Sequence, residues 1–339
     1  MTSIRLSPAL VGLAETLDTL ITLAPPLAGN HAGVGGARGV AFEPDLVYRS
    51  ARRRIRAPLA GTAARALSRR VRPGSPVILT TGLVTPRIPR GETDGPPGAV
   101  ALARALILGL GAHVLVLTEA PVVPVIRRTA EALAASEADP EDWRTRFAVE
   151  AFPADPVAAT KARDRIWSAD RPAALVSIEK LGPNSRGVIH TMRGEDVTAA
   201  QSRTDVFFPL ARREGVLSVG IGDRGNEIGL AGLLAHPARC VCPCGGSIAC
   251  AVRADVPVVA FSSNWGAHAV TALLAARLGD PRLFHQPLGE ARMLRQMVRA
   301  GAVDGVTRER VPTVDGGPLA LQVAFVGMLR ALLESFPRS

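Results

Sequence analysis

The feature that most constrains the fold of this chain is a series of six short, almost continuous apolar segments with helix-like stretches between them. Such segments are typical of strands that are buried on both faces, as in parallel sheets. The six predicted strands are residues 76–82, 113–118, 147–152, 173–178, 216–220 and 256–261. Helices are predicted at 99–108, 122–135, 157–169, 205–214, 267–278, 290–300 and 318–335. The pattern predicts an α/β fold with a doubly wound, mostly parallel sheet and helices on both faces.

The first part of the chain has a different character. Its first 70 residues have helical spacing, and Ser7-Pro8 is a good start for a helix. Residues 25–42 contain two prolines and many glycines, which indicates a flexible connection. We therefore expect a helical N-terminal extension over residues 1–75, packed on an α/β domain over residues 76–339.

Composition excludes several classes of protein. With 339 residues, 47% of them hydrophobic, the chain is long enough for one large core. No apolar stretch approaches the ~18 residues of a membrane span, and the N-terminus lacks the pattern of a signal peptide, so a cytoplasmic protein is expected. The net charge of +10 comes almost entirely from arginine and aromatic residues make up only 4%, so no nucleic-acid partner is expected. A homo-oligomer is left open.

The strongest functional signal is an acidic, glycine-rich turn over residues 221–229, directly after the fifth predicted strand. It contains Asp223, Asn226 and Glu227, and a small-residue pattern over 230–235 predicts a helix after it. Ligands of open α/β sheets bind at the carboxyl ends of strands, where such a turn would lie. The alternative is a solvated turn that caps a helix.

Three further strand ends carry polar, glycine-bearing loops. Thr81-Gly82 and the segment 91–98 follow the first strand, segments 179–184 and 190–194 follow the fourth, and segment 262–266 follows the last. Four such loops at one sheet edge indicate an active site. No P-loop, nucleophile elbow or zinc-protease motif is present, so the chemistry is expected to need only the substrate, with or without a divalent ion.

Four cysteines are crowded at positions 240, 242, 244 and 250. Their spacing differs from the usual zinc-ligand spacing, and no histidine lies nearby in a ligand pattern. Free thiols are therefore expected in preference to a metal cluster.

Nine segments between about residues 76 and 317 form a recognisable series: 80–82, 92–96, 177–179, 192–194, 222–229, 248–250, 263–266, 301–307 and 313–316. In their sequence and order these segments resemble the D-glutamate cyclase family. The resemblance implies cyclisation of D-glutamate to 5-oxo-D-proline with loss of water, or the reverse hydrolysis. The chain departs from the family pattern at Arg224, where glycine is usual, at Ile189-His190-Thr191 and at Ala267-His268. These departures leave the substrate open, and His268 would make activity pH-sensitive if it lay in the site.

The reaction implied by the resemblance predicts roles for individual residues of these loops. Asp223 and Glu227 are expected to divide the acid and base roles, with Glu179 as a third catalytic carboxylate. A competing use of Glu179, Asp223 and Glu227 is to hold manganese or magnesium. The expected substrate-binding residues are Thr81, Gly82, Thr93, Asp94, Gly95, Arg193, Arg224, Asn226, Asn264 and Trp265.

Within this set, Arg193 would pair with the α-carboxylate of the substrate, and Asn226 and Asn264 would donate to the oxyanion. The structural alternatives are a buried salt bridge for Arg193 and core packing for Trp265. Two other functions remain open: a related enzyme that acts on a different amino acid or lactam, and a non-catalytic protein that binds an amino acid.

Overall fold

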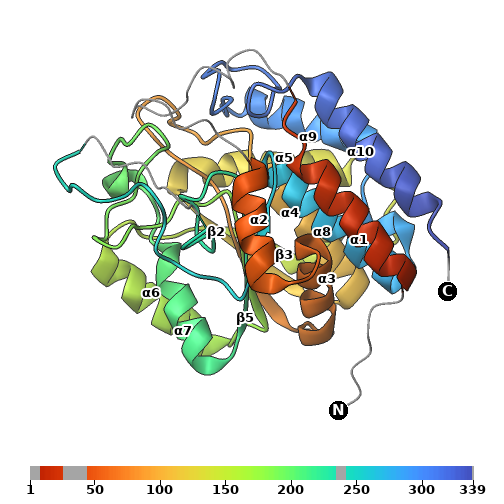
Figure 1. Cartoon of the computed structure of the whole chain (residues 1–339), viewed down its shortest axis with the longest axis horizontal. Helices are drawn as coiled ribbons and strands as arrows, with labels where there is room; N and C mark the ends of the chain where they lie inside the picture. The colour runs from red at the N-terminus through yellow and green to blue at the C-terminus, as the bar shows by residue number, and fades with distance from the viewer. Residues whose placement is uncertain (1–7, 26–43, 234–241, 338–339) are drawn as a thin grey trace.

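The computed structural model describes residues 8–25, 44–233 and 242–337, which form a six-stranded parallel sheet surrounded by helices (Figure 1). The strand order is β3-β2-β1-β4-β5-β6. The strands are β1 (Pro76–Thr80), β2 (His113–Thr118), β3 (Phe147–Ala151), β4 (Ala174–Ile178), β5 (Leu217–Gly222) and β6 (Val256–Val259). Each overlaps one of the six apolar segments, so the predicted α/β fold is confirmed.

The helices follow the predicted order, with ends displaced by a few residues. They are α1 (Pro8–Thr22), α2 (Pro44–Ile55), α3 (Leu59–Arg70), α4 (Pro96–Leu110), α5 (Val123–Ala134), α6 (Pro156–Ala169), α7 (Phe207–Glu214), α8 (Ser263–Leu278), α9 (Pro287–Arg299) and α10 (Leu319–Glu334). Local sequence explains several ends. For example, α4 begins with a proline in its first turn and ends at Gly111 in the left-handed conformation.

The sheet is covered on both faces, because alternate residues of each strand point to opposite sides. Val77 and Leu79 of β1 pack in the core that includes α3, α4 and α8. Ile78 packs in a second core with residues of α6 and α7, such as Trp167 and Phe207. Figure 1 shows α6 and α7 on one side of the sheet and α1, α3, α8 and α10 on the other.

The N-terminal helices join the main core through a buried carboxylate. Asp18 of α1 accepts the backbone N–H groups of Leu59 and Ala60 in the first turn of α3, which has no side-chain cap of its own. Burial raises the pKa of Asp18 to about 6, against these hydrogen bonds. The helical character of this segment is confirmed for its described residues, and the division of the chain at residue 75 stays a prediction.

One predicted helix is wrong. Leu230 forms a bridge with Arg253, and Leu233 closes a turn on Leu230, so residues 230–233 are not helical. Gly229 and Gly232 have φ angles of 105° and 75°, which a helix cannot accommodate. The rest of that prediction, 234–235, and residues 26–42 of the expected connection lie outside the described residues. Within the described ranges, no helix combines the length and apolar character needed to cross a bilayer.

Candidate active site

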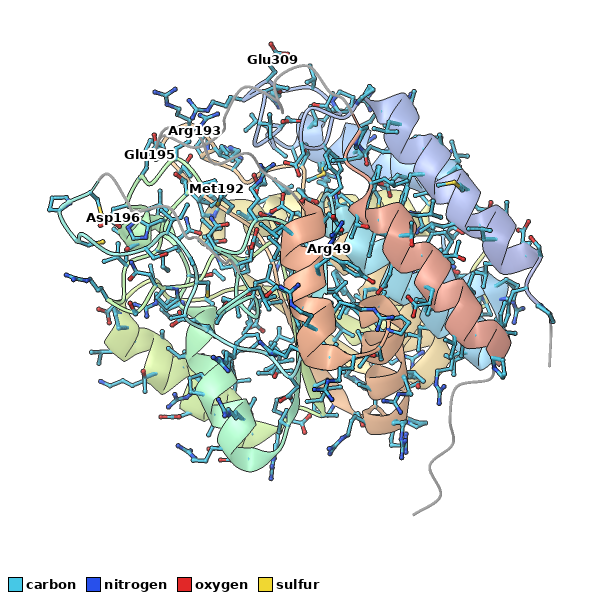
Figure 2. The ribbon with its side chains drawn as sticks, in the orientation of Figure 1. Arg49, Met192, Arg193, Glu195, Asp196 and Glu309 are labelled. Carbon is cyan, nitrogen blue, oxygen red and sulfur yellow. The ribbon has the colours of Figure 1, made fainter. Side chains whose placement is uncertain are left out.

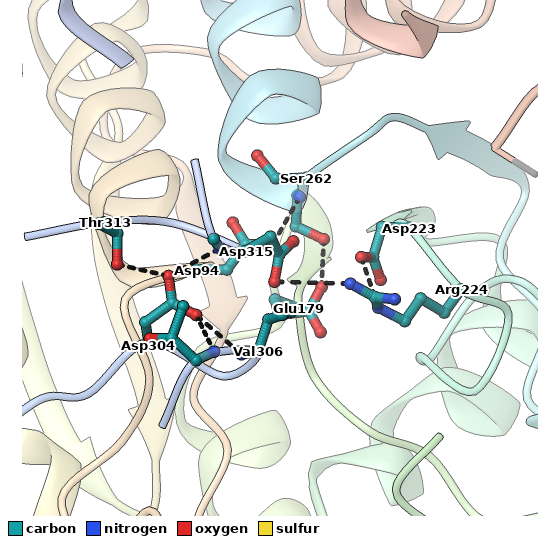
Figure 3. A network of polar contacts seen from close by, with 12 residues as sticks. Asp94, Glu179, Asp223, Arg224, Ser262, Asp304, Val306, Thr313 and Asp315 are labelled. Carbon is teal, nitrogen blue, oxygen red and sulfur yellow. Dashed lines mark hydrogen bonds and ion pairs between the residues drawn. The ribbon is translucent and has the colours of Figure 1, made fainter. Parts of the chain in front are cut away.

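The polar loops that follow β1, β4 and β5 meet at the carboxyl edge of the sheet. The strand order reverses between β1 and β4, and crevices at such points are the usual ligand sites of doubly wound sheets. Asp94 precedes α4, Glu179 follows β4 and Asp223 follows β5. Their carboxylates offer oxygen atoms that lie within 4.8 Å of one another (Figure 3).

Asp94 is held between the first turns of two helices. Its Oδ2 accepts the Ser263 N–H at 2.8 Å and its Oδ1 accepts the Asn264 N–H at 2.8 Å, at the start of α8. Its Oδ1 also accepts the Gly95 N–H at 3.0 Å, just before α4. Gly95 has a φ of 97°, and a Cβ there would lie 2.8 Å from the Cβ of Glu179. A glycine is therefore needed for the loops to approach this closely.

The side chain of Asn264 forms hydrogen bonds with the backbone of the loop that contains Asp94. Its Oδ1 accepts the N–H groups of Gly95 and Gly98 at 3.0 and 2.9 Å, and its Nδ2 donates to the Thr93 carbonyl at 3.0 Å. The amide thus joins the start of α8 to the start of α4. This geometry makes Asn264 a residue that positions Asp94, and its expected contact with an oxyanion stays a prediction.

Trp265 and His268 also belong to α8 but lie in the helical layers. The Trp265 ring stacks on Phe325, with centroids 3.9 Å apart, and is 4% exposed. His268 is buried with its Nε2 3.2 Å from Glu290 Oε2, beside His285. Neither lines the pocket described below. Trp265 therefore packs in the core and does not make the expected substrate contact. His268 lies away from the loops of the site.

Glu179 has a strained backbone. Its φ of 47° lies in the left-handed region, which few residues other than glycine adopt and which often marks functional sites. Its Oε2 accepts a hydrogen bond from Ser263 Oγ. The next residue, Lys180, is fully buried, pairs with Glu119 and donates to the Gly82 carbonyl at 3.1 Å. This ion pair was not predicted, because a single lysine after a strand forms no pattern in the sequence.

The acidic turn at residues 223–227 is folded around the carboxylate of Glu227. Oε1 accepts the Arg224 N–H at 2.9 Å and the Asp223 N–H at 3.3 Å, and Oε2 accepts the Gly225 N–H at 2.7 Å. All five residues of the turn are buried, so the alternative of a solvated turn is wrong. Glu227 holds the turn that presents Asp223, and its expected proton transfer stays a prediction.

Arg224 points into the site between two carboxylates (Figure 3). Its Nε lies 2.9 Å from Asp223 Oδ2, and its Nη2 lies 3.6 Å from Asp315 Oδ1. Asp304 fixes the loop that carries Asp315, since its Oδ2 accepts the Gly316 N–H at 2.9 Å. Asp315 was not among the predicted site residues because it follows no strand. Its glycine-bearing acidic turn, similar to that of Asp223, is the signal that could have identified it.

Five buried carboxylates share this site: Glu92, Asp94, Glu179, Asp223 and Asp315. Burial is the largest cause that raises the pKa of each, and neighbouring carboxylates add to it. The pKa of Asp315 rises to about 6 even though Arg224 opposes the shift. One guanidinium cannot balance five buried negative charges. The cluster must therefore hold protons or a further cation at neutral pH.

Several buried polar atoms around these carboxylates have no hydrogen-bond partner within the described structure. They are Thr81 Oγ1, Glu92 Oε1, Thr93 Oγ1, Asp223 Oδ1 and Asn226 Oδ1. Buried polar atoms are nearly always paired, so a group of exceptions in one place indicates that a ligand completes them. All but Glu92 belong to residues that the sequence predicted for the site.

A pocket opens beside the carboxylates. Its lining includes the polar site residues Glu92, Glu179, Arg224, Asn226 and Asp315, together with Leu83, Thr191, Met192, Arg193, Glu195, Val306 and Arg308. Figure 2 shows Met192, Arg193 and Glu195 close together on a loop at the periphery. The Arg193 side chain is half-buried and forms no ion pair in the described part of the chain. It is therefore available to an anionic group in the pocket.

The carboxylates grouped closely enough for one cation differ from the predicted set by one residue. The group consists of Asp94, Glu179 and Asp223, and it does not include Glu227. Oxygen ligands suit magnesium or manganese. The divalent cation stays a prediction, with Asp94 in place of Glu227.

Comparison with known proteins gives two findings. The family model for the C-terminal region of D-glutamate cyclase-like proteins matches residues 44–330, a range that contains every site residue described above. The human protein named D-glutamate cyclase, mitochondrial (Homo sapiens), is 30% identical over 204 residues. That match covers 58% of this chain and 32% of the human protein, so the chain corresponds to about a third of its relative.

Proposed function

The chain belongs to the D-glutamate cyclase-like family, and from this premise we propose that it interconverts D-glutamate, or a close analogue, and 5-oxo-D-proline. This would make it a carbon–oxygen lyase that forms or opens a lactam. The observation that supports the proposal is the cluster of five buried carboxylates with raised pKa values, beside polar atoms that lack partners. Such groups are suited to exchanging protons with a bound substrate near neutral pH.

Ring formation needs proton transfer at two atoms. The α-amine attacks the γ-carboxyl carbon, a C–N bond forms, and one oxygen leaves as water. The five-membered ring supplies proximity once the substrate is held folded. Glu179 and Asp223 share the proton transfers: the ionised one accepts a proton from the ammonium group, and the protonated one donates to the leaving hydroxyl. Glu227 acts on the reaction by positioning Asp223.

The polar pocket residues orient the substrate. Arg193 pairs with the α-carboxylate, for which its fork of donors is suited. Asn226 already donates through Nδ2 to the His190 carbonyl at 2.9 Å, so its Oδ1 accepts from the substrate amine. Arg224 stabilises the oxyanion from within the cluster. A competing use of Asp94, Glu179 and Asp223 is to hold a divalent cation, which would supply Lewis-acid polarisation of the γ-carboxyl group.

Arg224 favours an analogue of glutamate as a second candidate substrate. The family usually has glycine at this position, and the long side chain here enters the pocket. It reduces the space for the substrate and adds donors that match an additional acceptor group.

The test is turnover by the purified chain. D-glutamate, 5-oxo-D-proline, substituted analogues and the L-enantiomers should be incubated with and without manganese and separated by chiral chromatography. Conversion of a D-substrate, lost in Glu179→Gln, is the expected result. Binding of these compounds without conversion in either direction would identify a non-catalytic amino-acid-binding protein. Conversion of another amino acid or lactam alone would keep the reaction class and replace the substrate.

A further inference from the structure

A second cluster of metal-ligating side chains lies outside the carboxylate site. His190 Nε2 is 3.2 Å from Cys242 Sγ and 3.5 Å from Cys244 Sγ, and the three atoms all lie within 4.8 Å of one another. Free thiols were predicted, because the cysteine spacing differs from that of usual zinc ligands and no histidine lies nearby in a ligand pattern. The fold supplies one from a loop that follows β4. Cys250 is a buried free thiol elsewhere, and Cys240 lies outside the described residues.

The spacing of these atoms fits coordination of a single ion. In a tetrahedral zinc site, Zn–S distances of about 2.3 Å and Zn–N distances of about 2.0 Å place nitrogen and sulfur about 3.5 Å apart. Both measured N···S distances are close to this value. Moreover, both sulfurs face the same ring nitrogen, which has one lone pair and can accept only one thiol hydrogen bond well. One ion placed between the three atoms could contact all of them at once.

The surroundings also suit coordination. The Gly246 N–H donates to Cys244 Sγ at 3.3 Å, as is common around metal thiolates. His190 is 1% exposed, whereas both cysteines are partly exposed, which gives an ion a path of entry.

The cluster is joined to the wall of the pocket. The His190 carbonyl accepts the hydrogen bond from Asn226, and the next three residues, 191–193, line the pocket. The Thr191 N–H donates to the Glu195 carbonyl at 3.0 Å, which closes this loop on itself. An ion that ties His190 to the 242–244 turn would therefore hold the loop that carries Arg193.

We propose that His190, Cys242 and Cys244 form a binding site for one thiophilic metal ion of the Zn²⁺ class, which fixes the 190–194 loop. Thiolate and imidazole ligands select zinc, whereas the carboxylates of the pocket select magnesium or manganese. Binding displaces the protons of any protonated thiols, and a water completes the tetrahedron. This site is separate from the catalytic carboxylates and does not depend on the proposed reaction.

The test is metal binding by the full chain, kept reduced and freed of metal by a chelator. Titration with cobalt(II) should produce a thiolate-to-metal charge-transfer band that saturates at one equivalent of cobalt. Zinc should displace the cobalt and abolish this band. Cys242→Ser, Cys244→Ser and His190→Gln should each weaken zinc binding by about 100-fold or more, since even residues behind the ligands contribute 10- to 100-fold. Cys250→Ser is the matched control and should bind normally, as should Glu179→Gln, which changes only the carboxylate site.

Two results would overturn the proposal. One is the absence of a thiolate band with cobalt in the reduced protein. The other is normal zinc affinity in both cysteine variants. A second readout does not depend on the affinity of any variant: zinc should slow hydrogen exchange of the backbone amides at 190–194 in the wild type. Unchanged exchange on zinc binding would contradict the anchoring of the loop.

Discussion

The protein buries carboxylates in two places, and their pKa values are shifted in opposite directions. In the carboxylate cluster of the candidate site, Arg224 pairs with Asp223 and Asp315, and the pKa values of all five carboxylates rise. Between the helices, Glu290 is 1% exposed and its Oε2 lies 2.9 Å from His285 Nε2 and 3.2 Å from His268 Nε2. Burial alone would raise the pKa of Glu290, but the two histidines together lower it to about 2. Equal burial thus gives opposite ionisation.

The difference lies in the partners. The Glu290 carboxylate has two partners, so its charge is stabilised where it stands and it contributes to packing. The five clustered carboxylates outnumber the guanidinium of Arg224 that pairs with them, and oxygen atoms such as Asp223 Oδ1 have no hydrogen-bond partner in the described structure. A folded protein retains such an arrangement when a ligand or a reaction needs it. Substitutions in the two groups should therefore affect different properties.

The largest expected effect is on turnover. Glu179→Gln keeps the shape of the side chain but cannot exchange a proton, so kcat should fall roughly 10³-fold. Stability should stay the same or rise, because the change removes one of several crowded buried carboxylates. Steady-state kinetics and urea unfolding of the same preparation measure both. Turnover at the wild-type rate would remove Glu179 from the reaction.

Glu227→Gln is the matched control for that result. In the native turn, one carboxylate oxygen of Glu227 accepts the Arg224 N–H and the other accepts the Gly225 N–H. An amide group has only one oxygen that can accept, so the turn should loosen. The expected result is lower stability together with slower turnover. A loss of turnover equal to that of Glu179→Gln with full stability would instead place Glu227 in proton transfer, as the sequence first suggested.

The next effect is on stability alone. Glu290→Ala leaves the imidazoles of His268 and His285 buried without their carboxylate acceptor, and a buried donor left without its partner costs about 2 kcal/mol. The free energy of unfolding should fall by this amount, while KM for the substrate stays close to the wild-type value. Unchanged stability would show that the histidines do not need Glu290. A changed KM would show that the two groups are coupled.

The sequence predicted the sheet well because its signal is local. The apolar segments mark every strand, and prolines and glycines mark helix ends such as those of α4. It also predicted which loops meet, since parallel strands place their carboxyl ends at one edge. The wrong helix at 230–233 followed small-residue composition, whereas the positive φ angles of Gly229 and Gly232 determine the turn.

Side-chain direction was the part that sequence could not supply. Asn264 and Trp265 are adjacent, yet one fastens the Asp94 loop and the other stacks on Phe325. That choice depends on how α8 packs against α4 and α10, which are far away in sequence. Asp315 likewise reaches the site through a loop that Asp304 organises and that no strand precedes. Contacts between distant segments carry no periodic signal.

The third effect is the pH dependence of stability, where the two groups should act in opposite directions. The pKa of Asp315 is raised from 3.8 to about 6, so its contribution to stability is full below pH 3.8 and is lost as the pH rises through about 6. The pKa of His285 is lowered from 6.5 to about 4 and that of Glu290 from 4.5 to about 2. Their contributions are present above pH 6.5 and 4.5 and are lost on acidification.

Urea unfolding across this pH range separates the two groups. The free energy of unfolding should decline between about pH 4 and pH 6, and Asp315→Asn should reduce this decline by about 1 kcal/mol or more, because one pKa unit corresponds to 1.36 kcal/mol. Glu290→Gln should instead reduce the loss of stability that occurs on acidification. The same pH profile for wild type and both variants would mean that other groups control it.

The smallest expected effect concerns Arg224, the guanidinium that pairs with Asp223 and Asp315 in the carboxylate cluster. Arg224→Gly keeps the backbone N–H that donates to Glu227, so the turn should survive. The guanidinium lowers the pKa of both Asp223 and Asp315, so its removal should raise them and move the ionisation of the cluster to higher pH. We expect the ratio of kcat/KM for D-glutamate to that for substituted analogues to change about fivefold, or roughly 1 kcal/mol. Arg224→Lys, which keeps the charge, should retain the pH profile while losing the second donor. If the glycine variant leaves every ratio and the pH profile unchanged, Arg224 does not determine specificity, and the five carboxylates are balanced by protons or by a bound cation alone.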